Sequence, residues 1–123
     1  MTNSTKKVLA VVSDLMFTVK IQGAAKQAGL EVTFAGSREK ALEQARLGSA
    51  ALIIDLNGKV EPLELIRTLK GDVETSHIPL IGYVSHVQAD LRQAAQDAGC
   101  DMVVARSTFS EKLPSILSGT IKE

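Results

Sequence analysis

ALIIDLNG, residues 51 to 58, is a short apolar run that ends on a carboxylate, Asp55, and continues into the loop-forming pair Asn57 and Gly58. Aliphatic residues without alternation are typical of a strand that is covered on both faces. An uncompensated carboxylate inside a core costs several kcal/mol, so Asp55 must leave the core at the strand end or have partners there. Both alternatives predict a functional site at Asp55.

Four further segments have the character of strands. Residues 8–12, 78–84 and 101–105 are short and apolar on both faces, apart from Asp101 at the start of the last segment, as is typical of strands covered on both sides. Residues 30–35 alternate more between apolar and polar side chains, which is typical of an edge strand. Together with residues 51–55, these segments predict five strands.

Helical patterns separate the predicted strands, because apolar residues recur there at helix spacing. Gly29 and Gly99 stand where a glycine would end a helix. Ser37 is suited to cap one helix, and Pro62 to the first turn of the next. The last helix is expected to be short, with Pro114 in or near its first turn, because proline would break a helix interior.

The β-α alternation, repeated five times, specifies a parallel sheet with helices on both faces. We expect an α/β fold with one doubly wound five-stranded sheet of order 2-1-3-4-5, a flavodoxin-like three-layer sandwich, as a single domain over residues 1–123. Such folds bind ligands at the carboxyl ends of the strands, between the first and the third. Asp14 follows the first strand and Asp55 ends the third, so both carboxylates are predicted to reach the same crevice.

The composition limits the classes of function. Fourteen basic residues balance fourteen acidic ones, which leaves no overall field to attract nucleic acid or an anionic membrane. No apolar run approaches the roughly 20 residues of a membrane helix, and the start, MTNSTKK, lacks a secretory signal. The single Cys100 cannot form an internal disulfide. We therefore expect a cytoplasmic protein without nucleic-acid or membrane partners.

Five pieces of the chain, in order, resemble the receiver domains of bacterial response regulators. VLAVVSD (8–14) is similar to the first strand and acidic turn of the family, LIIDLN (52–57) to its phospho-acceptor strand, and LELIRTLKG (63–71) to the helix that follows. IPLIGYVS (78–85) resembles the fourth strand, which ends on a hydroxyl residue. AGCDMVVARSTF (98–109) resembles the stretch that leads to a conserved basic residue. The resemblance covers nearly the whole chain and implies two-component phosphorelay signalling.

The resemblance also implies roles for individual residues. Asp55 takes the position of the aspartate that accepts a phosphoryl group from a kinase histidine, and Ser85 takes that of the helping hydroxyl. Arg106 stands where the family has a lysine. In phosphoryl transfer a divalent ion, a cation and a hydroxyl neutralise the developing charge. The planar guanidinium of Arg106 can pair with carboxylates and phosphates through two hydrogen bonds at a time. Arg106 is therefore expected either to bind a phosphate or carboxylate ligand, or to be a structural partner of Asp14 or Asp55.

The metal pocket departs from the family pattern. The acidic pair that holds Mg²⁺ corresponds here to Ser13 with Asp14 in one register, or to Val12 with Ser13 in the other. At most one acid of the pair is kept, so Asp14, Asp55 and Asn57 are the candidate ligands of a weak Mg²⁺ site.

Two further departures concern switching and access. The aromatic residue that family members carry on the last strand is replaced by Val103 or Val104, and His86 adds bulk beside the pocket. Family members usually meet partners at the fourth helix and fifth strand. These departures predict slow labelling by small phosphate donors and a weak conformational switch.

Three functions follow from these observations. The first is a stand-alone receiver, not an enzyme, that takes phosphate on Asp55 from a sensor histidine kinase or phosphotransfer protein and then binds a downstream protein. The second is a pseudo-receiver that acts as an interaction module without phosphorylation. The third, a nucleotide- or flavin-binding protein, is disfavoured because the first strand is followed by SDLMFT (13–18) and not by a glycine-rich turn.

Overall fold

The structure is a computed structural model, and it describes residues 6–85 and 88–121. Strands and helices alternate along these residues, as the sequence predicts. The elements are β1 (Lys7–Val11), α1 (Leu15–Gln27), β2 (Glu31–Phe34), α2 (Arg38–Arg46), β3 (Ala51–Asp55), α3 (Pro62–Gly71), β4 (Leu80–Val84), α4 (Ala89–Ala98), β5 (Met102–Ala105) and α5 (Arg106–Thr120).

The five strands form one sheet of order β2-β1-β3-β4-β5, and every pair of neighbours is parallel. The predicted topology is therefore confirmed, including the edge position of β2. In the register of the sheet, Val11 lies opposite Ile54 and Asp55 lies opposite Tyr83. Asp55 thus ends a central strand, with β1 on one side and β4 on the other.

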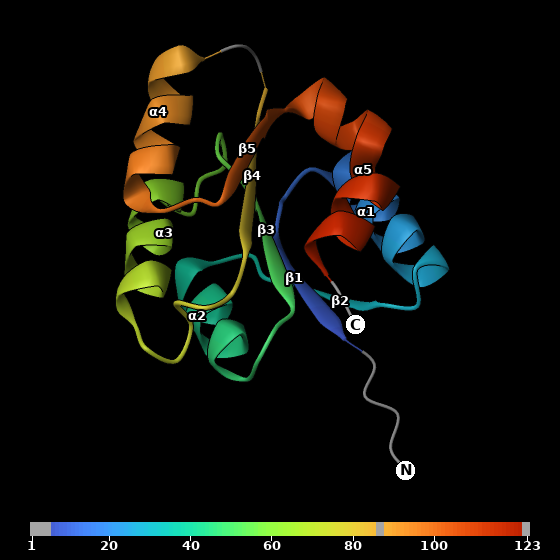
Figure 1. Cartoon of the computed structure of the whole chain (residues 1–123), viewed down its shortest axis with the longest axis horizontal. Coiled ribbons are helices and arrows are strands. Elements are labelled where there is room, and N and C mark those ends of the chain that lie inside the picture. Colours follow the sequence, from blue (N-terminus) through green and yellow to red (C-terminus); the bar gives the residue numbers. More distant parts are fainter. Residues whose placement is uncertain (1–5, 86–87, 122–123) are drawn as a thin grey trace.

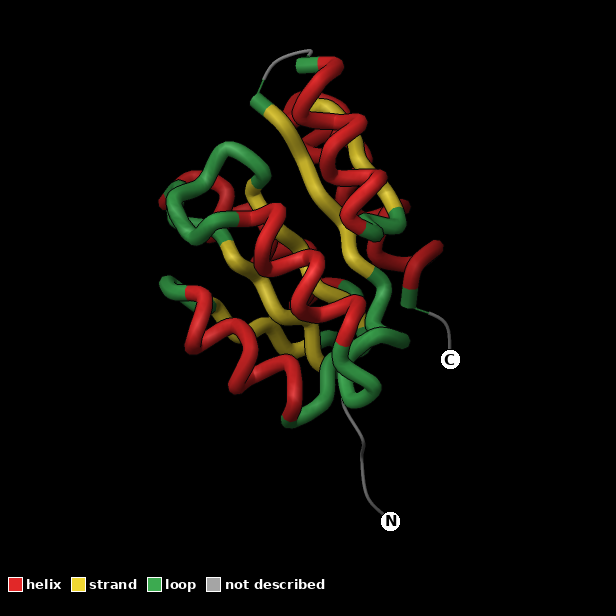
Figure 2. The backbone as a smooth tube through the Cα atoms, turned by 90° about the vertical axis from the view of Figure 1, so that its left-hand side faces the viewer, coloured by secondary structure: helices red, strands yellow, loops and turns green. Residues whose placement is uncertain are grey.

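The helices form two layers (Figure 1). α1 and α5 cover one face of the sheet, and α2, α3 and α4 cover the other, as the view onto that second face also shows (Figure 2). Each face has its own apolar core: Val8, Ala10, Ile53 and Tyr83 point toward α1 and α5, whereas their strand neighbours point the other way. This alternation is the strand period of two, with helices on both faces.

Local signals in the sequence set most element boundaries. The Ser37 hydroxyl caps α2 by accepting a hydrogen bond from the Lys40 N–H at 3.1 Å, and Pro62 is the first residue of α3. Gly99 follows α4 with φ +116°, where a Cβ would lie 2.8 Å from Cγ of Lys70. β4 begins at Leu80, two residues later than predicted, and the preceding Pro79 has no N–H to give to the ladder.

The final helix is longer than predicted, although Pro114 lies near the first turn of its second part, as expected. α5 begins directly after β5 and runs for 15 residues. Lys112 inside it has non-helical angles, φ −108° and ψ 18°, so that the helix is kinked there. Pro114 consequently lies in the first turn after the kink, where its ring and its missing N–H are tolerated. Within the described residues, no helix has the length and apolar character needed to cross a membrane.

Candidate phosphoryl site

Asp14 is the N-cap of α1. Its Oδ1 accepts hydrogen bonds from the N–H groups of Met16 at 2.9 Å and Phe17 at 3.4 Å, which satisfies donors that the first turn of a helix leaves free. Its Oδ2 pairs with the guanidinium of Arg106. Both carboxylate oxygens of Asp14 are therefore engaged within the protein.

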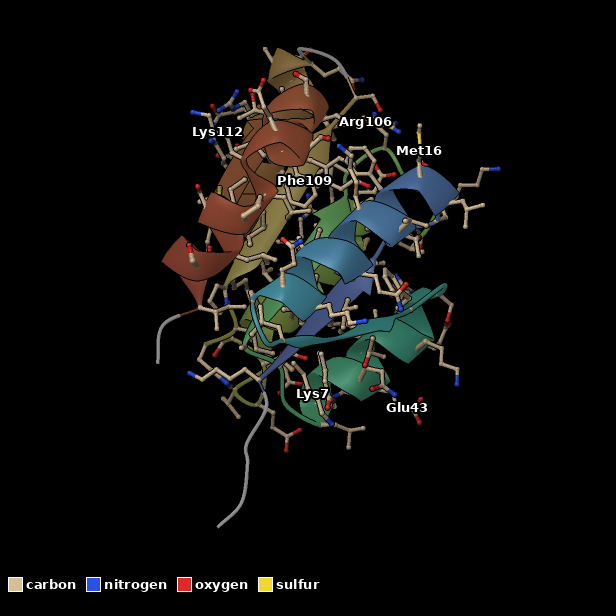
Figure 3. All side chains as sticks on the ribbon, turned by 90° about the vertical axis from the view of Figure 1, so that its right-hand side faces the viewer. Lys7, Met16, Glu43, Arg106, Phe109 and Lys112 are labelled. Atoms are coloured by element: carbon tan, nitrogen blue, oxygen red, sulfur yellow. The ribbon has the colours of Figure 1, made fainter. Side chains whose placement is uncertain are left out.

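Arg106 is the first residue of α5, and its guanidinium reaches α1 because the two helices pack on the same face of the sheet. Figure 3 shows Arg106 and Met16 at the same end of the molecule, opposite Lys7. Cζ of Arg106 lies 4.4 Å from the centre of the Phe17 ring, a cation–π contact. The sequence allowed Asp14 or Asp55 as the partner of Arg106, and in the structure Arg106 pairs with Asp14.

The Arg106 pair changes the titration of Asp14. Partial burial acts to raise the pKa of the Asp14 carboxyl, but hydrogen bonds from Arg106 and from the backbone N–H groups of Phe17 and Met16 outweigh it. The pKa of Asp14 is consequently held below its ordinary value. Asp14 is thus a charged, internally neutralised group.

Asp55 has a different environment at the end of β3. Its Oδ1 accepts a hydrogen bond from the Asn57 N–H at 2.9 Å, and within the described ranges it forms no ion pair. Burial raises the pKa of the Asp55 carboxyl, and the Asn57 N–H and the charge of Arg106 reverse this effect only in part. Asp55 is therefore the half-buried, unpaired carboxylate of the site.

The side chain of Asn57 joins two loops. Its Oδ1 accepts a hydrogen bond from the Ser85 N–H at 2.7 Å, and its Nδ2 donates to Oε1 of Gln88 at 2.8 Å. The loop after β3 is thereby tied to the residues that precede α4. The side-chain oxygen of Asn57, a candidate metal ligand in the sequence, is thus already occupied. The bond to Ser85 uses its backbone, so the hydroxyl takes no part in this link.

A cavity of about 20 Å³ lies beside Asp55, which is space for about one water molecule. It is lined by Asp55, Ser13, Gly58 and Lys59 together with apolar and small neighbours, namely Val11, Val12, Ala35, Gly36 and Val60. The cavity therefore holds one carboxylate, Asp55, and a lysine on its rim.

The donor set does not fit a resident Mg²⁺ ion well. Both oxygens of Asp14 are engaged, and Val12, at the other candidate position of the acidic pair, is a core residue with 7% exposure. In the part of the chain that the structure describes, no three His, Cys, Asp or Glu side chains are grouped as a metal site. A divalent ion prefers several oxygen ligands, which here would require Asp14 to leave Arg106.

Several residues near the site were not singled out from the sequence. Tyr83 packs on the face of the sheet that carries Asp55, and Phe17 lies under Arg106. Tyr83 stands two residues before Ser85, so the strand period of two could have indicated that both share a face. His86, expected beside the pocket, lies outside the described residues.

No protein-family model matches the chain, and no curated protein matches it in sequence. Solved structures match it closely. A response regulator from Hahella chejuensis superposes with a TM-score of 0.86 at 20% identity, covering 96% of each chain. The chemotaxis response regulator CheY4 of Vibrio cholerae reaches 0.83 at 20% identity, covering 95% of this chain and 99% of its own. The phosphorylated cyanobacterial phytochrome response regulator RcpA reaches 0.78 at 20% identity, over 94% and 91%.

The likeness extends over nearly the whole of both chains in each comparison, and it agrees with the strand order and the two helical layers. At 20% sequence identity, this likeness shows a shared fold and no more than that. The chain therefore has the fold of the response-regulator receiver domains.

Proposed function

We propose that this chain is a receiver protein of two-component signalling in which Asp55 accepts a phosphoryl group from a sensor histidine kinase or a phosphotransfer protein. The observation that carries the proposal is the state of Asp55. Its carboxylate is half-buried and unpaired among the described residues, at the carboxyl end of a central strand, while Arg106 is close enough to act on its pKa. A carboxylate without a counterion partner remains available as a nucleophile.

In this transfer the phosphoryl group moves from a histidine nitrogen of the donor to a carboxylate oxygen of Asp55. An oxygen of Asp55 forms a bond to phosphorus while the P–N bond of the donor phosphohistidine breaks, and the leaving imidazole nitrogen keeps the electron pair and takes up a proton from the solvent. The transition state places negative charge on the three equatorial oxygens. Arg106, whose charge acts on Asp55, and Lys59, which lines the cavity beside Asp55, are cations that can offset that charge.

The same residues support a reduced role for Mg²⁺. The ion pair with Arg106 already neutralises Asp14, so a divalent ion would compete with a resident guanidinium for that carboxylate. We propose that the chain binds Mg²⁺ weakly and that the protein acts by carrying the phosphoryl group and binding a downstream partner, without turnover of a small molecule.

A second candidate function is a pseudo-receiver that binds a partner without phosphorylation. One observation favours it: α1 presents Leu15, Met16 and Val19 to solvent with 76%, 67% and 63% exposure, beside Arg106. Clustered exposed apolar side chains are typical of interaction surfaces. Such a surface exists whether or not Asp55 carries a phosphoryl group.

Phosphorylation assays on the purified chain separate the two functions. The protein is incubated with acetyl phosphate, and separately with a phosphorylated histidine phosphotransfer domain, and intact mass spectrometry measures the added phosphoryl group. We expect slow labelling by acetyl phosphate, faster labelling by the histidine donor, and none in Asp55→Asn. Rapid stoichiometric labelling by acetyl phosphate would contradict the altered pocket, and no labelling by either donor would favour the pseudo-receiver.

A further inference from the structure

Tyr83 lies on β4 directly opposite Asp55 in the sheet register. Its ring belongs to the core beneath α1 and α5, as does Ile53, two residues before Asp55 on β3. Because residues two apart on a strand share a face, the side chains of Asp55 and Tyr83 lie on the same face of the sheet. Tyr83 is 1% exposed, so its ring is buried in the core on that face, next to the strand position of Asp55.

The ring of Tyr83 is held in an aromatic stack. Its centroid lies 4.9 Å from that of Phe17 on α1 and 4.8 Å from that of Phe109 on α5. Figure 3 shows Phe109 on α5, below Arg106. Since the chain has only three phenylalanines and one tyrosine, most of its aromatic side chains are gathered at this point. The stack connects Tyr83, the residue opposite Asp55, to both helices of this layer.

The hydroxyl of Tyr83 is buried, and among the described residues it has no hydrogen-bond partner. Leaving a buried hydroxyl unpaired is costly, and such groups in proteins usually have an explanation. The surroundings of this hydroxyl are charged: after burial, the negative charge of Asp55 is the next cause that raises the pKa of Tyr83. The hydroxyl therefore lies within electrostatic reach of the Asp55 carboxylate.

We propose that the Tyr83 hydroxyl is the hydrogen-bond donor for an anionic group carried on Asp55, and that Phe17 and Phe109 pass the resulting ring movement to α1 and α5. Without the group, the hydroxyl has no hydrogen-bond partner among the described residues, whereas a phosphoryl group extends farther from β3 than a carboxylate and offers oxygen acceptors. The inference rests on the proposed function, because it takes Asp55 as the residue that carries the group.

The proposed role of Tyr83 gives a path from the pocket to the helices, which the sequence did not predict. The last strand has valines where the family carries an aromatic residue, so no signal path was predicted from the pocket to the helices. Tyr83 provides an aromatic residue on the neighbouring strand β4, in contact with two helices. The surface expected to respond is the one formed by α1 and α5, which includes the exposed Leu15, Met16 and Val19.

The first experiment does not depend on phosphorylation. Asp55→Glu moves the carboxylate outward by one methylene, and Asp55→Asn keeps the original length as the matched control. Because Tyr83 is the only tyrosine, protein labelled with ¹³C-tyrosine gives one ring Cζ signal, which reports hydrogen bonding of the hydroxyl. We expect this signal to move clearly in Asp55→Glu, and to move less in Asp55→Asn, which removes the charge without extending the side chain toward the hydroxyl.

The second experiment follows the same signal while intact mass spectrometry measures the phosphoryl group that the histidine donor adds to Asp55. A Tyr83 signal that moves in proportion to the added mass supports the inference. Modification with an unmoved signal, in a chain whose Asp55→Glu signal is also unmoved, overturns the inference and leaves the proposed function intact. If Asp55 is not modified but the Tyr83 signal moves in Asp55→Glu, the proposed function is overturned and the reach of the hydroxyl is supported. If Asp55 is not modified and the signal does not move in Asp55→Glu, both the function and the inference are overturned.

Tyr83→Phe separates the hydroxyl from the ring. The substitution keeps the aromatic stack, so we expect a melting temperature that is unchanged or higher. We also expect the phosphoryl group on Asp55 to be lost several-fold faster than in wild type, because one of its hydrogen bonds is missing. An unchanged lifetime would contradict a binding role for the hydroxyl, even in a variant that folds normally.

Discussion

The guanidinium of Arg106 at the start of α5 is paired with the carboxylate of Asp14 at the start of α1, across a separation of 92 residues in sequence. β3 and β4 lie between the strands that precede these two helices, so the pair joins the outer ends of the site around Asp55. Arg106 therefore neutralises Asp14, whereas Asp55 has no ion-pair partner among the residues that the structure describes. The two carboxylates are therefore expected to respond differently to substitution and to pH.

Removing the resident cation should destabilise the fold in a pH-dependent way. The pKa of Asp14 is lowered in the folded protein, so its ionised form contributes stability above its ordinary value of 3.8, and this contribution is lost as the pH falls through the folded pKa. We expect Arg106→Gln to lower the melting temperature by a few degrees near neutral pH and by less under acidic conditions. Thermal melts over this pH range test it.

Arg92→Gln on α4 is the matched control, because Arg92 is exposed and makes no ion pair within the described residues. It should leave the melting profile close to that of wild type. A melting profile of Arg106→Gln that parallels wild type from acidic to neutral pH would argue against a stabilising Asp14 pair.

Replacing Asp55 should have the opposite effect on stability. Burial raises the pKa of Asp55 in the fold, so its ionisation disfavours folding once the pH rises above its ordinary value of 3.8. Asp55→Asn removes this charge, and we expect it to raise the melting temperature near neutral pH and to have little effect under acidic conditions. Asp97→Asn, at an exposed position on α4, is the control. A destabilised Asp55→Asn protein at neutral pH would show that the carboxylate is stabilised by partners.

Mg²⁺ affinity should respond to the charge of the pocket. We expect weak binding in the wild type, and roughly tenfold tighter binding in Ser13→Asp, because one added charge at contact distance contributes about 1 kcal/mol or more. Arg106→Gln should also strengthen binding, since it frees Asp14. Isothermal titration calorimetry measures these affinities, with Ser115→Asp on α5 as a control of equal charge. Wild-type binding at sub-millimolar level that Ser13→Asp leaves unchanged would show that the site lies elsewhere.

The link through Asn57 should hold the residues before α4 in place. Asn57→Ala removes both side-chain hydrogen bonds, to the Ser85 N–H and to Gln88, whereas Gln88→Ala removes only the second. Each exposed bond contributes about 1 kcal/mol, so amide exchange at Ser85 should accelerate roughly thirtyfold in Asn57→Ala, which loses both bonds, and roughly fivefold in Gln88→Ala, which loses one. Hydrogen exchange followed by NMR measures this. Equal protection of Ser85 in wild type and Asn57→Ala would rule the link out.

The sequence by itself was enough for the strand order and for the position of Asp55. Short apolar runs, helix caps such as Ser37 and the first-turn Pro62 are local signals, and each depends on a few neighbouring residues. Parallel strands also place their carboxyl ends at one edge of the sheet, so Asp14 and Asp55 could be assigned to a common site without coordinates. The length of α5 could not be predicted in this way, because the kink at Lys112 lets the helix continue through the turn that holds Pro114.

Only the tertiary structure decided what the side chains of the site do. Arg106 had two candidate partners in the sequence, and the choice of Asp14 depends on the packing of α5 against α1. The Tyr83 hydroxyl, which has no hydrogen-bond partner among the described residues, likewise owes its burial to three elements, β4, α1 and α5, that meet around one ring. Residue patterns encode which face of a strand is buried, but ion pairs and hydrogen bonds depend on side-chain directions over a few ångströms, which arise only when distant segments pack together.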